Sequence, residues 1–220
     1  TAATVFAGAL SRAGIEVVGA PEPGVAAEGG ATLASAESAP LSQIVERILE
    51  VSDNEASEVL LRHIGAATGG EASFVDGERG VEEMLREHGV RLGPSNLDDG
   101  SGLSRANRID PRTLIDVLRL AASPDLPELR AVLTGLPVAG FSGSLADRFD
   151  GPWPEARGRV RAKTGTLTGV HSLAGIAIGP DGVPMLFALM TDRVRLLDNS
   201  AAELTIDNAA AALGACRCGA

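Results

Sequence analysis

The sequence contains a single lysine, no tyrosine and only two cysteines, and each shortage narrows what the protein can be. Aromatic residues make up 3% of the 220 residues, so leucine, valine, isoleucine and alanine must fill the interior. Both cysteines, Cys216 and Cys218, lie at the C-terminal end. Two thiols alone do not form a zinc site, and a disulfide closing a one-residue loop would be strained. We therefore expect the pair to be unrelated to activity. It does not indicate whether the protein works in an oxidising or a reducing compartment.

Long apolar runs and positive charge are also scarce. No apolar run approaches the ~18 residues that a membrane helix needs. The formal net charge is -10, and an acidic surface repels phosphate backbones and anionic lipid headgroups. We therefore expect no nucleic-acid partner and no binding to a membrane surface. With 45% hydrophobic and 22% charged residues, the composition is that of a globular chain with a real core.

The chain divides into three sections by composition and periodicity. It begins with Thr1 rather than Met and shows no signal peptide, so its start reads as a cut made by processing or by design. A connecting segment that starts the main domain is followed by a mostly helical part, and then by strands with a final helix. These sections cover residues 1–37, 38–157 and 158–220.

Helix signals dominate the first two sections. Residues 2–13 are alanine-rich and helical in character, and Ile15–Val18 favours a short strand. From Leu41 the apolar residues recur with helical spacing after a proline, which predicts an amphipathic helix. The S-D-N triplet at 52–54 breaks this helix, and a second helix follows that we expect Gly65 to close.

Strand signals dominate the last section. Residues 158–164, 170–178 and 183–191 predict three strands, and the turn at 179–182 predicts a hairpin between the last two. The last two strands are almost continuously apolar, as expected of strands covered by helices on both faces. A final helix is predicted over about 200–213.

Two short motifs carry chemistry. Lys163-Thr164-Gly165, followed by Thr166, stands at the end of the first predicted strand and contains the only lysine of the chain. A surface lysine at a strand end is the alternative interpretation of this motif. Ser52-Asp53-Asn54 lies upstream, and helix capping alone would explain it. In this order, however, S-D-N and K-T-G are two of the three motifs of penicillin-binding proteins and β-lactamases.

Further stretches make the resemblance specific. D-G-S-G-L-S begins at Asp99, A-G-F-S-G-S-L at Ala139 and L-A-G-I-A-I at Leu173. With these, the chain from Pro40 onward resembles the low-molecular-mass class C penicillin-binding proteins, the DacB-like D-alanyl-D-alanine carboxypeptidases and endopeptidases. D-G-S-G-L-S separates this family from β-lactamases and simpler carboxypeptidases, although a plain glycine/serine turn is its alternative interpretation.

The resemblance implies an α/β fold of the penicillin-binding-protein and serine β-lactamase type. In that fold a five-stranded antiparallel sheet is flanked by helices and joined by a helical subdomain. This chain would supply the C-terminal strands, the closing helix and most of the helical subdomain. The active-site cleft would lie between the strand of Lys163 and the helix break at Ser52.

The resemblance also implies a substrate, a peptidoglycan stem peptide ending in D-Ala-D-Ala. Lys163 and the hydroxyls of Thr164 and Thr166 would bind its terminal carboxylate by charge-assisted hydrogen bonds. A backbone N–H just after Gly165 would donate to the oxyanion. The strand itself would pair with the extended peptide as an edge strand.

Two further roles follow from the resemblance. Ser52 would relay a proton toward the leaving-group nitrogen, and Asn54 would hold the side-chain amide of the substrate. Strict alternation places Lys163 and Thr164 on opposite faces of their strand. Both can serve one site only if the strand borders the cleft or is twisted or bulged there.

The first family motif, S-x-x-K, is missing from this sequence. It holds the nucleophilic serine and its activating lysine, but the only lysine is Lys163 and the residue three before it is Val160. In the family the nucleophile lies far upstream, beyond inserted domains. We therefore expect the C-terminal part of a longer protein, with the upstream half as its partner and with no activity of the chain alone.

Two other interpretations stay open. One is a non-catalytic module of the same fold that binds peptidoglycan or acts as a scaffold. The other is an unrelated serine hydrolase using Ser142 in G-F-S-G-S, where Ser144 replaces the final glycine of G-x-S-x-G. The favoured family implies binding of β-lactam antibiotics, an extracytoplasmic location and no metal or other cofactor.

Overall fold

The structure is a computed structural model that describes residues 2–25 and 28–218. It divides into two compact units, Thr1–Ser38 and Ala39–Ala220. In the first unit, helix α1 (Ala2–Arg12) confirms the expected helix. The strand expected at Ile15–Val18 is wrong, because a strand needs a hydrogen-bonded neighbour and the described residues of this unit provide no strand to pair with.

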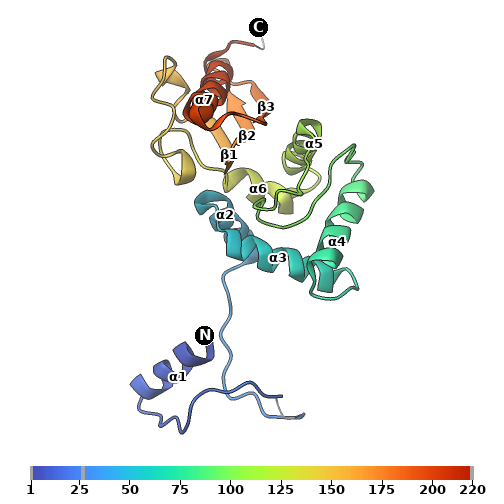
Figure 1. Cartoon of the computed structure of the whole chain (residues 1–220), viewed down its shortest axis with the longest axis vertical. Helices are drawn as coiled ribbons and strands as arrows, with labels where there is room; N and C mark the ends of the chain where they lie inside the picture. Colours follow the sequence, from blue (N-terminus) through green and yellow to red (C-terminus); the bar gives the residue numbers. More distant parts are fainter. Residues whose placement is uncertain (1, 26–27, 219–220) are drawn as a thin grey trace. The chain divides into compact units, whose positions relative to one another are not determined.

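The second unit holds the remaining helices and all three strands of the described residues (Figure 1). In chain order its elements are α2 (Leu41–Val51), α3 (Asn54–Ala67), α4 (Phe74–Glu87), α5 (Pro111–Ala121), η1 (Pro127–Leu129), α6 (Arg130–Thr134), η2 (Gly143–Leu145), η3 (Pro154–Ala156), β1 (Val160–Leu167), β2 (Val170–Ile178), β3 (Pro184–Thr191), η4 (Leu196–Asp198) and α7 (Asn199–Ala215). The helices between Leu41 and Thr134 and the strands from Val160 onward thus belong to one compact unit.

The three strands form an antiparallel sheet in the order β1-β2-β3. Pairing of β1 with β2 is unbroken from Val160 opposite Ala177 to Leu167 opposite Val170. The K-T-G motif therefore lies inside β1 and not at its end, because pairing continues until the short turn at Gly169. The hairpin turn before β3 is confirmed by a 3.0 Å hydrogen bond from the Gly182 N–H to the Gly179 carbonyl.

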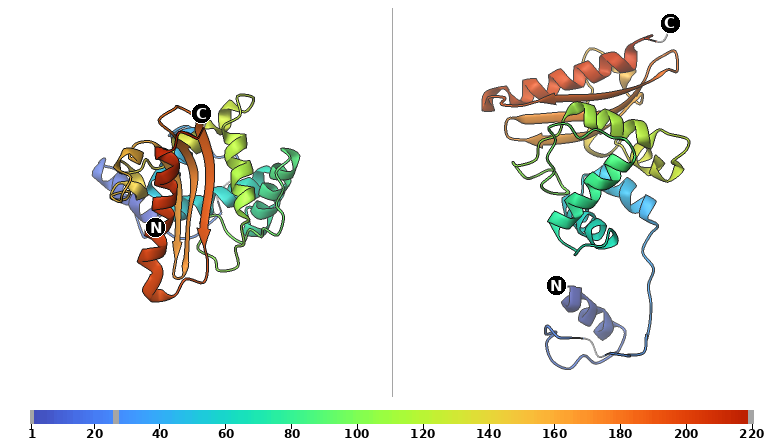
Figure 2. Two further views of the ribbon diagram at one scale, coloured as in Figure 1. Left: turned by 90° about the horizontal axis from the view of Figure 1, so that it is seen from above. Right: turned by 90° about the vertical axis from the view of Figure 1, so that its right-hand side faces the viewer.

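Helices cover both faces of the sheet, as the apolar strands predicted. Helix α7 lies on one face and α5 on the other (Figure 2). Between α7 and the sheet is a hydrophobic core that includes Leu145, Leu173 and Phe187. Along β2 the residues facing α7 are buried and most of those facing the other way are half-buried. The antiparallel sheet flanked by helices confirms the expected fold class.

The helical part confirms one predicted helix start and corrects one predicted end. Helix α2 begins after Pro40 as predicted. Further along, the Asp110 side chain caps α5 at Pro111. Gly65 does not close α3, which continues to Ala67. Gly65 is needed for packing, because a Cβ there would lie 2.8 Å from the Gly77 nitrogen of α4. Within the described residues no helix is both long and apolar enough to cross a bilayer.

The C-terminal cysteines differ from expectation. Cys216 and Cys218 form a disulfide, with their Cα atoms 5.3 Å apart. That separation is within the ordinary range for disulfides, so a one-residue loop is closed here despite the strain we expected.

A buried ion pair attaches α7 to the segment between η2 and η3. Arg148 donates from Nε and Nη2 to the two carboxylate oxygens of Asp207, over 2.9 and 2.5 Å. Both side chains are largely shielded, with 15% of Arg148 and 8% of Asp207 exposed. Removing Asp207 would leave the buried Arg148 with only a longer contact, of 3.6 Å, to Glu203.

We predict that Asp207→Ala lowers the free energy of unfolding by about 3 kcal/mol, the scale for breaking a buried pair. Urea titration monitored by circular dichroism measures this loss of unfolding free energy. The matched control is Asp192→Ala, because Asp192 and Arg193 form an exposed contact at 3.7 Å and such contacts contribute little. Equal losses in the two variants would contradict the structural role assigned to Asp207.

Candidate active site

The two motifs meet in the folded chain. The Lys163 Nζ donates to the Ser52 Oγ over 2.7 Å. The same ammonium donates to the Thr164 carbonyl over 2.9 Å. Both residues are half-buried. The surface-lysine interpretation of K-T-G therefore fails, because this side chain turns inward onto the first residue of S-D-N.

Ser52 stands in a strained backbone conformation. It ends α2 in the left-handed region, with φ 57° and ψ 54°, which costs a non-glycine residue roughly 1–2 kcal/mol. The next residue, Asp53, caps α3 by accepting the Ala56 N–H over 3.0 Å. Capping thus explains Asp53 but not Ser52, whose hydroxyl faces Lys163.

Burial changes the acidity of Lys163. Desolvation of the ammonium lowers the pKa of Lys163 below its usual value, because the charged form loses hydration. In the described residues no carboxylate forms an ion pair with Lys163 to offset this loss. The structure therefore holds a partly dehydrated positive charge whose best partner would be an incoming anion.

Strand β1, which carries Lys163, is an edge strand of the sheet. Along its outer edge, the Ala162 N–H donates to the Pro137 carbonyl and the Ala139 N–H donates to the Val160 carbonyl. Backbone groups alternate in direction along an edge strand, so those of Thr164 and Thr166 point outward as well. Within the described residues we find no backbone partner for the outward N–H of Thr166. An extended peptide can pair with this edge.

The strict alternation expected from the sequence is observed. Lys163 extends to Ser52 of the α2–α3 break, and the Thr164 hydroxyl lies 2.9 Å from the Ser144 hydroxyl of η2. The pairing contains no bulge from Val160 to Leu167. Both side chains can therefore serve one site only across the open edge of β1, which is one of the alternatives the sequence left.

The D-G-S-G-L-S stretch is more than a plain turn. Its Asp99 carboxylate accepts hydrogen bonds from the backbone N–H of Gly102 and Ser104, over 2.7 and 2.6 Å, and from the Asn107 amide over 2.7 Å. Burial by itself raises the pKa of Asp99, but these bonds outweigh it and hold the pKa below its usual value. The loop is thus organised around one carboxylate.

The same loop is fastened to the helix that follows S-D-N. The Glu58 carboxylate of α3 accepts the N–H groups of Gly100 and Ser101, over 2.8 and 3.1 Å. Sequence reasoning missed Glu58, since a glutamate on a helix gives no signal of a distant loop. Asn54, one turn earlier, is exposed, and no hydrogen bond to its side chain occurs among the described residues.

The structure thus brings some of the predicted site residues together, but not all of them. Ser52 and Lys163 are in contact, and Thr164, Gly165 and Thr166 follow Lys163 along β1. Asn54 begins α3, and no hydrogen bond joins its side chain to them among the described residues. The catalytic and substrate-binding roles of these residues stay predictions.

Ser142, the alternative nucleophile, has a structural contact. Its hydroxyl accepts the Val138 N–H over 3.1 Å. None of the hydrogen bonds among the described residues joins it to a histidine. A serine hydrolase centred on Ser142 has no support from this arrangement, because nucleophilic serines need an adjacent base.

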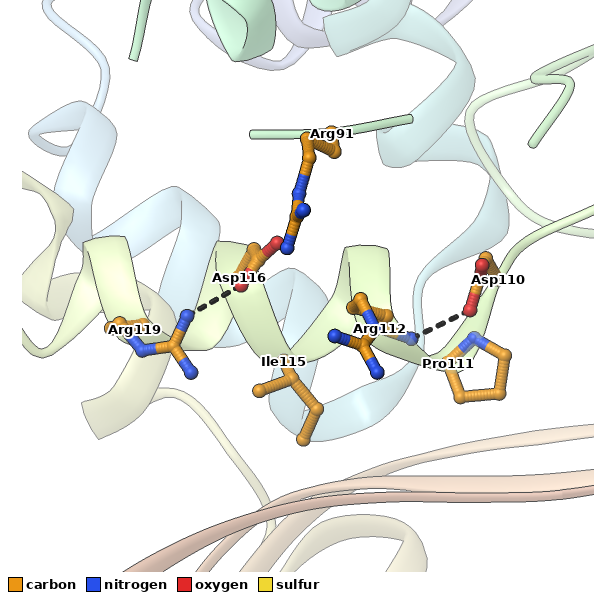
Figure 3. A pocket seen from close by; sticks show the side chains of 7 residues that line it. All are labelled: Arg91, Asp110, Pro111, Arg112, Ile115, Asp116 and Arg119. Atoms are coloured by element: carbon orange, nitrogen blue, oxygen red, sulfur yellow. Dashed lines mark hydrogen bonds and ion pairs between the residues drawn. The ribbon is translucent and has the colours of Figure 1, made fainter. Parts of the chain in front are cut away.

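The hollow shown in Figure 3 lies elsewhere, along α5. Its two carboxylates already have partners, because Asp110 caps α5 and Asp116 pairs with Arg119 over 2.5 Å. It shares no residue with the S-D-N and K-T-G motifs. We assign it no part in the chemistry. The lining consists of Arg91, Asp110, Pro111, Arg112, Ile115, Asp116 and Arg119.

Comparison with known proteins decides the family. Residues 1–213 match the D-Ala-D-Ala carboxypeptidase 3 (S13) family. The chain belongs to this family. It is 38% identical over 194 residues to carboxypeptidase DacB of Mycolicibacterium smegmatis, which covers 87% of this chain and 41% of that protein. It is 41% identical over 155 residues to the D-alanyl-D-alanine carboxypeptidase of an Actinomadura species, covering 68% of this chain and 28% of that protein.

A solved structure agrees with the S13 assignment. Penicillin binding protein 4 of Haemophilus influenzae, in complex with a β-lactam, is similar with a TM-score of 0.78 and 29% identity. The match covers 94% of this chain and 50% of that one. The chain thus has the fold of S13 penicillin-binding proteins, but it spans only about two fifths of the length of its M. smegmatis relative.

The Asp99 network gives this S13 chain a testable acid sensitivity. A carboxyl with a lowered pKa in the folded state stabilises the fold fully above its unfolded pKa, and that contribution is lost as the pH falls through the folded pKa. We predict that Asp99→Asn costs about 1.5–3 kcal/mol at neutral pH, the scale for hydrogen bonds to a charged group. The difference in the free energy of unfolding between Asp99→Asn and the parent protein should decrease as the pH falls.

Urea unfolding at a series of pH values measures this difference. Asp125→Asn is the matched control, because Asp125 is exposed and its side chain has no hydrogen bond among the described residues. A difference that stays constant from neutral to acidic pH would show that the charge of Asp99 does not organise the loop.

Proposed function

We propose that this chain forms the S-x-N and K-T-G walls of the active site of a serine-type D-Ala-D-Ala peptidase. The observation that carries the proposal is the 2.7 Å contact between Lys163 and Ser52. It brings together two motifs far apart in the sequence, as that chemistry requires. The names of relatives support it, since the two relatives described above are called carboxypeptidases.

The substrate we propose is a peptidoglycan stem peptide ending in D-Ala-D-Ala. Its terminal carboxylate would approach the ammonium of Lys163, which has no carboxylate partner among the described residues, and the hydroxyls of Thr164 and Thr166. Charge-assisted hydrogen bonds to such an anion are about twice as strong as neutral ones. A local positive charge of this kind is needed to draw an anion to a chain with a net charge of -10.

The edge of β1 would hold the peptide backbone. The outward backbone groups of Thr164 and Thr166 would pair with the extended substrate, adding it as a further strand. The N–H of Thr166, the residue after Gly165, would then donate to the oxygen that becomes negative during attack. One preorganised donor of this kind is worth roughly 10²–10³-fold in rate.

Ser52 would move the proton. Its oxygen accepts from Lys163, so its own O–H remains to donate to the leaving nitrogen. As the carbon–nitrogen bond breaks, the nitrogen takes this proton and Lys163 replaces it on Ser52. The lowered pKa of Lys163 favours such a transfer, since less free energy is needed to deprotonate it. Lys163 would regain a proton from solvent once the amine has left. Asn54 would hold the side-chain amide of the substrate.

The nucleophile would come from an upstream half of the same protein. This chain has no S-x-x-K motif, and its one lysine is already placed in K-T-G. The upstream half would supply the serine that forms the acyl-enzyme and the lysine that activates it. It would also complete the sheet, of which the described residues supply three strands.

Binding of β-lactams follows from the same geometry. The related penicillin binding protein 4 was solved with a β-lactam bound. A penicillin carries a carboxylate and a reactive amide, the two groups that the Lys163 site and the edge of β1 would bind. We propose an extracytoplasmic location, because peptidoglycan lies outside the membrane. Whether carboxypeptidase or endopeptidase action dominates depends on how the complete site treats the residues beyond the scissile bond.

Intact mass spectrometry after incubation with penicillin tests the proposal. We predict one covalent adduct on the longer protein, mapped by peptide digestion to the upstream half. We predict no adduct on this chain alone. Penicillin whose ring has already been hydrolysed is the control, because it retains the carboxylate but cannot acylate.

Two results would contradict this assignment. An adduct on the isolated chain would place the nucleophile within these 220 residues. The absence of any adduct on the longer protein would favour the non-catalytic peptidoglycan-binding or scaffolding module instead, for which the missing S-x-x-K of this chain is the supporting observation.

A further inference from the structure

We infer that Ser144 is a positioning residue for the reaction, acting through Thr164. This inference rests on the proposed function. It goes further by adding a residue from the A-G-F-S-G-S-L stretch to the site. The observation behind it is the 2.9 Å contact between the hydroxyls of Ser144 and Thr164.

The backbone of Ser144 is fixed from both sides. Gly143 has φ +53°, and a Cβ on it would lie 2.2 Å from the Glu50 carbonyl in the last turn of α2. On the other side, Leu145 is fully buried in the core under α7, and its carbonyl accepts the Gly140 N–H over 2.9 Å. Ser144 itself is an exposed residue. A rigid backbone thus presents an accessible side chain.

The segment Gly143–Leu145 therefore contacts both walls of the proposed site. Gly143 packs against α2 two residues before Ser52, and Ser144 contacts the residue after Lys163. Any other residue at position 143 would push this segment away from α2. Ser144 is thereby held at a set place relative to the edge of β1.

The chemistry of hydroxyl groups gives this contact a function. A hydroxyl has one donor and can accept two hydrogen bonds. In the structure Thr164 donates to Ser144. When a substrate carboxylate arrives, Thr164 must donate its hydrogen to that anion, and Ser144 then donates to the Thr164 oxygen instead. Ser144 thus keeps the Thr164 side chain in the binding rotamer before and after the substrate binds.

The test is steady-state kinetics of Ser144→Ala in the longer protein. Two substrates are compared, a diacylated tripeptide ending in D-Ala-D-Ala and the same peptide with a C-terminal amide. We expect KM for the carboxylate peptide to rise about 3–10-fold with kcat nearly unchanged, the effect of one lost neutral hydrogen bond. For the amide, whose carbonyl can accept only a weaker, neutral hydrogen bond from Thr164, kcat/KM should change less.

Three further variants distinguish a positioning role of Ser144 from a purely structural one. Ser144→Thr keeps the hydroxyl and should keep the parent KM. Ser144→Ala should add nothing in a Thr164→Ala background, because the residue acts through Thr164. Ser42→Ala is the matched control, since Ser42 is exposed near the start of α2 and its side chain has no hydrogen bond among the described residues.

The outcomes distinguish this inference from the proposed function. If the parent protein turns over the peptide and Ser144→Ala changes both substrates equally or neither, Ser144 is not a positioning residue and the proposed function stands. If the parent protein neither turns over the peptide nor forms a penicillin adduct, the proposed function and this inference both fall.

Discussion

The contact between the Lys163 ammonium and the Ser52 hydroxyl is the interaction on which the site depends. It joins the edge strand of the sheet to the break between α2 and α3 over 2.7 Å. The contact costs free energy at both residues, because Ser52 adopts a left-handed backbone conformation and the Lys163 ammonium is partly dehydrated. Strain and burial concentrated at one contact are typical of functional sites, where they are retained because the arrangement is needed.

The surrounding fold holds that contact in place. Helix α7 and its ion pair with Arg148 secure one face of the sheet, and Gly143 packs the η2 segment against α2. The Glu58 carboxylate binds the Asp99 loop to α3, directly after S-D-N. Each of these contacts links segments far apart in the chain, so the geometry at Lys163 depends on tertiary packing rather than on local sequence.

The sequence predicts the secondary-structure elements and the motifs better than the tertiary contacts between them. The pairing of S-D-N with K-T-G was foreseeable because the resemblance to penicillin-binding proteins implies a cleft between the two motifs. The strand at Ile15–Val18 was not ruled out, since β-branched residues cannot reveal that a pairing partner is missing. Gly65 was misread as a helix end because its packing partner, Gly77, lies on another helix. Ser144 was missed although its motif was recognised, because only the fold shows which hydroxyl its side chain meets.

The central claim is that Ser52 and Lys163 act as one unit in acylation. A double-mutant cycle on the rate of penicillin acylation of the longer protein, with Ser52→Ala and Lys163→Ala, tests this most directly. Each single change should slow acylation by roughly 10²–10⁴-fold, as expected when a positioned proton donor is lost. The double variant should be hardly slower than the slower single variant, because residues that act together are not additive. Effects that multiply in the double variant would contradict the claim and show that the two side chains are close without working together.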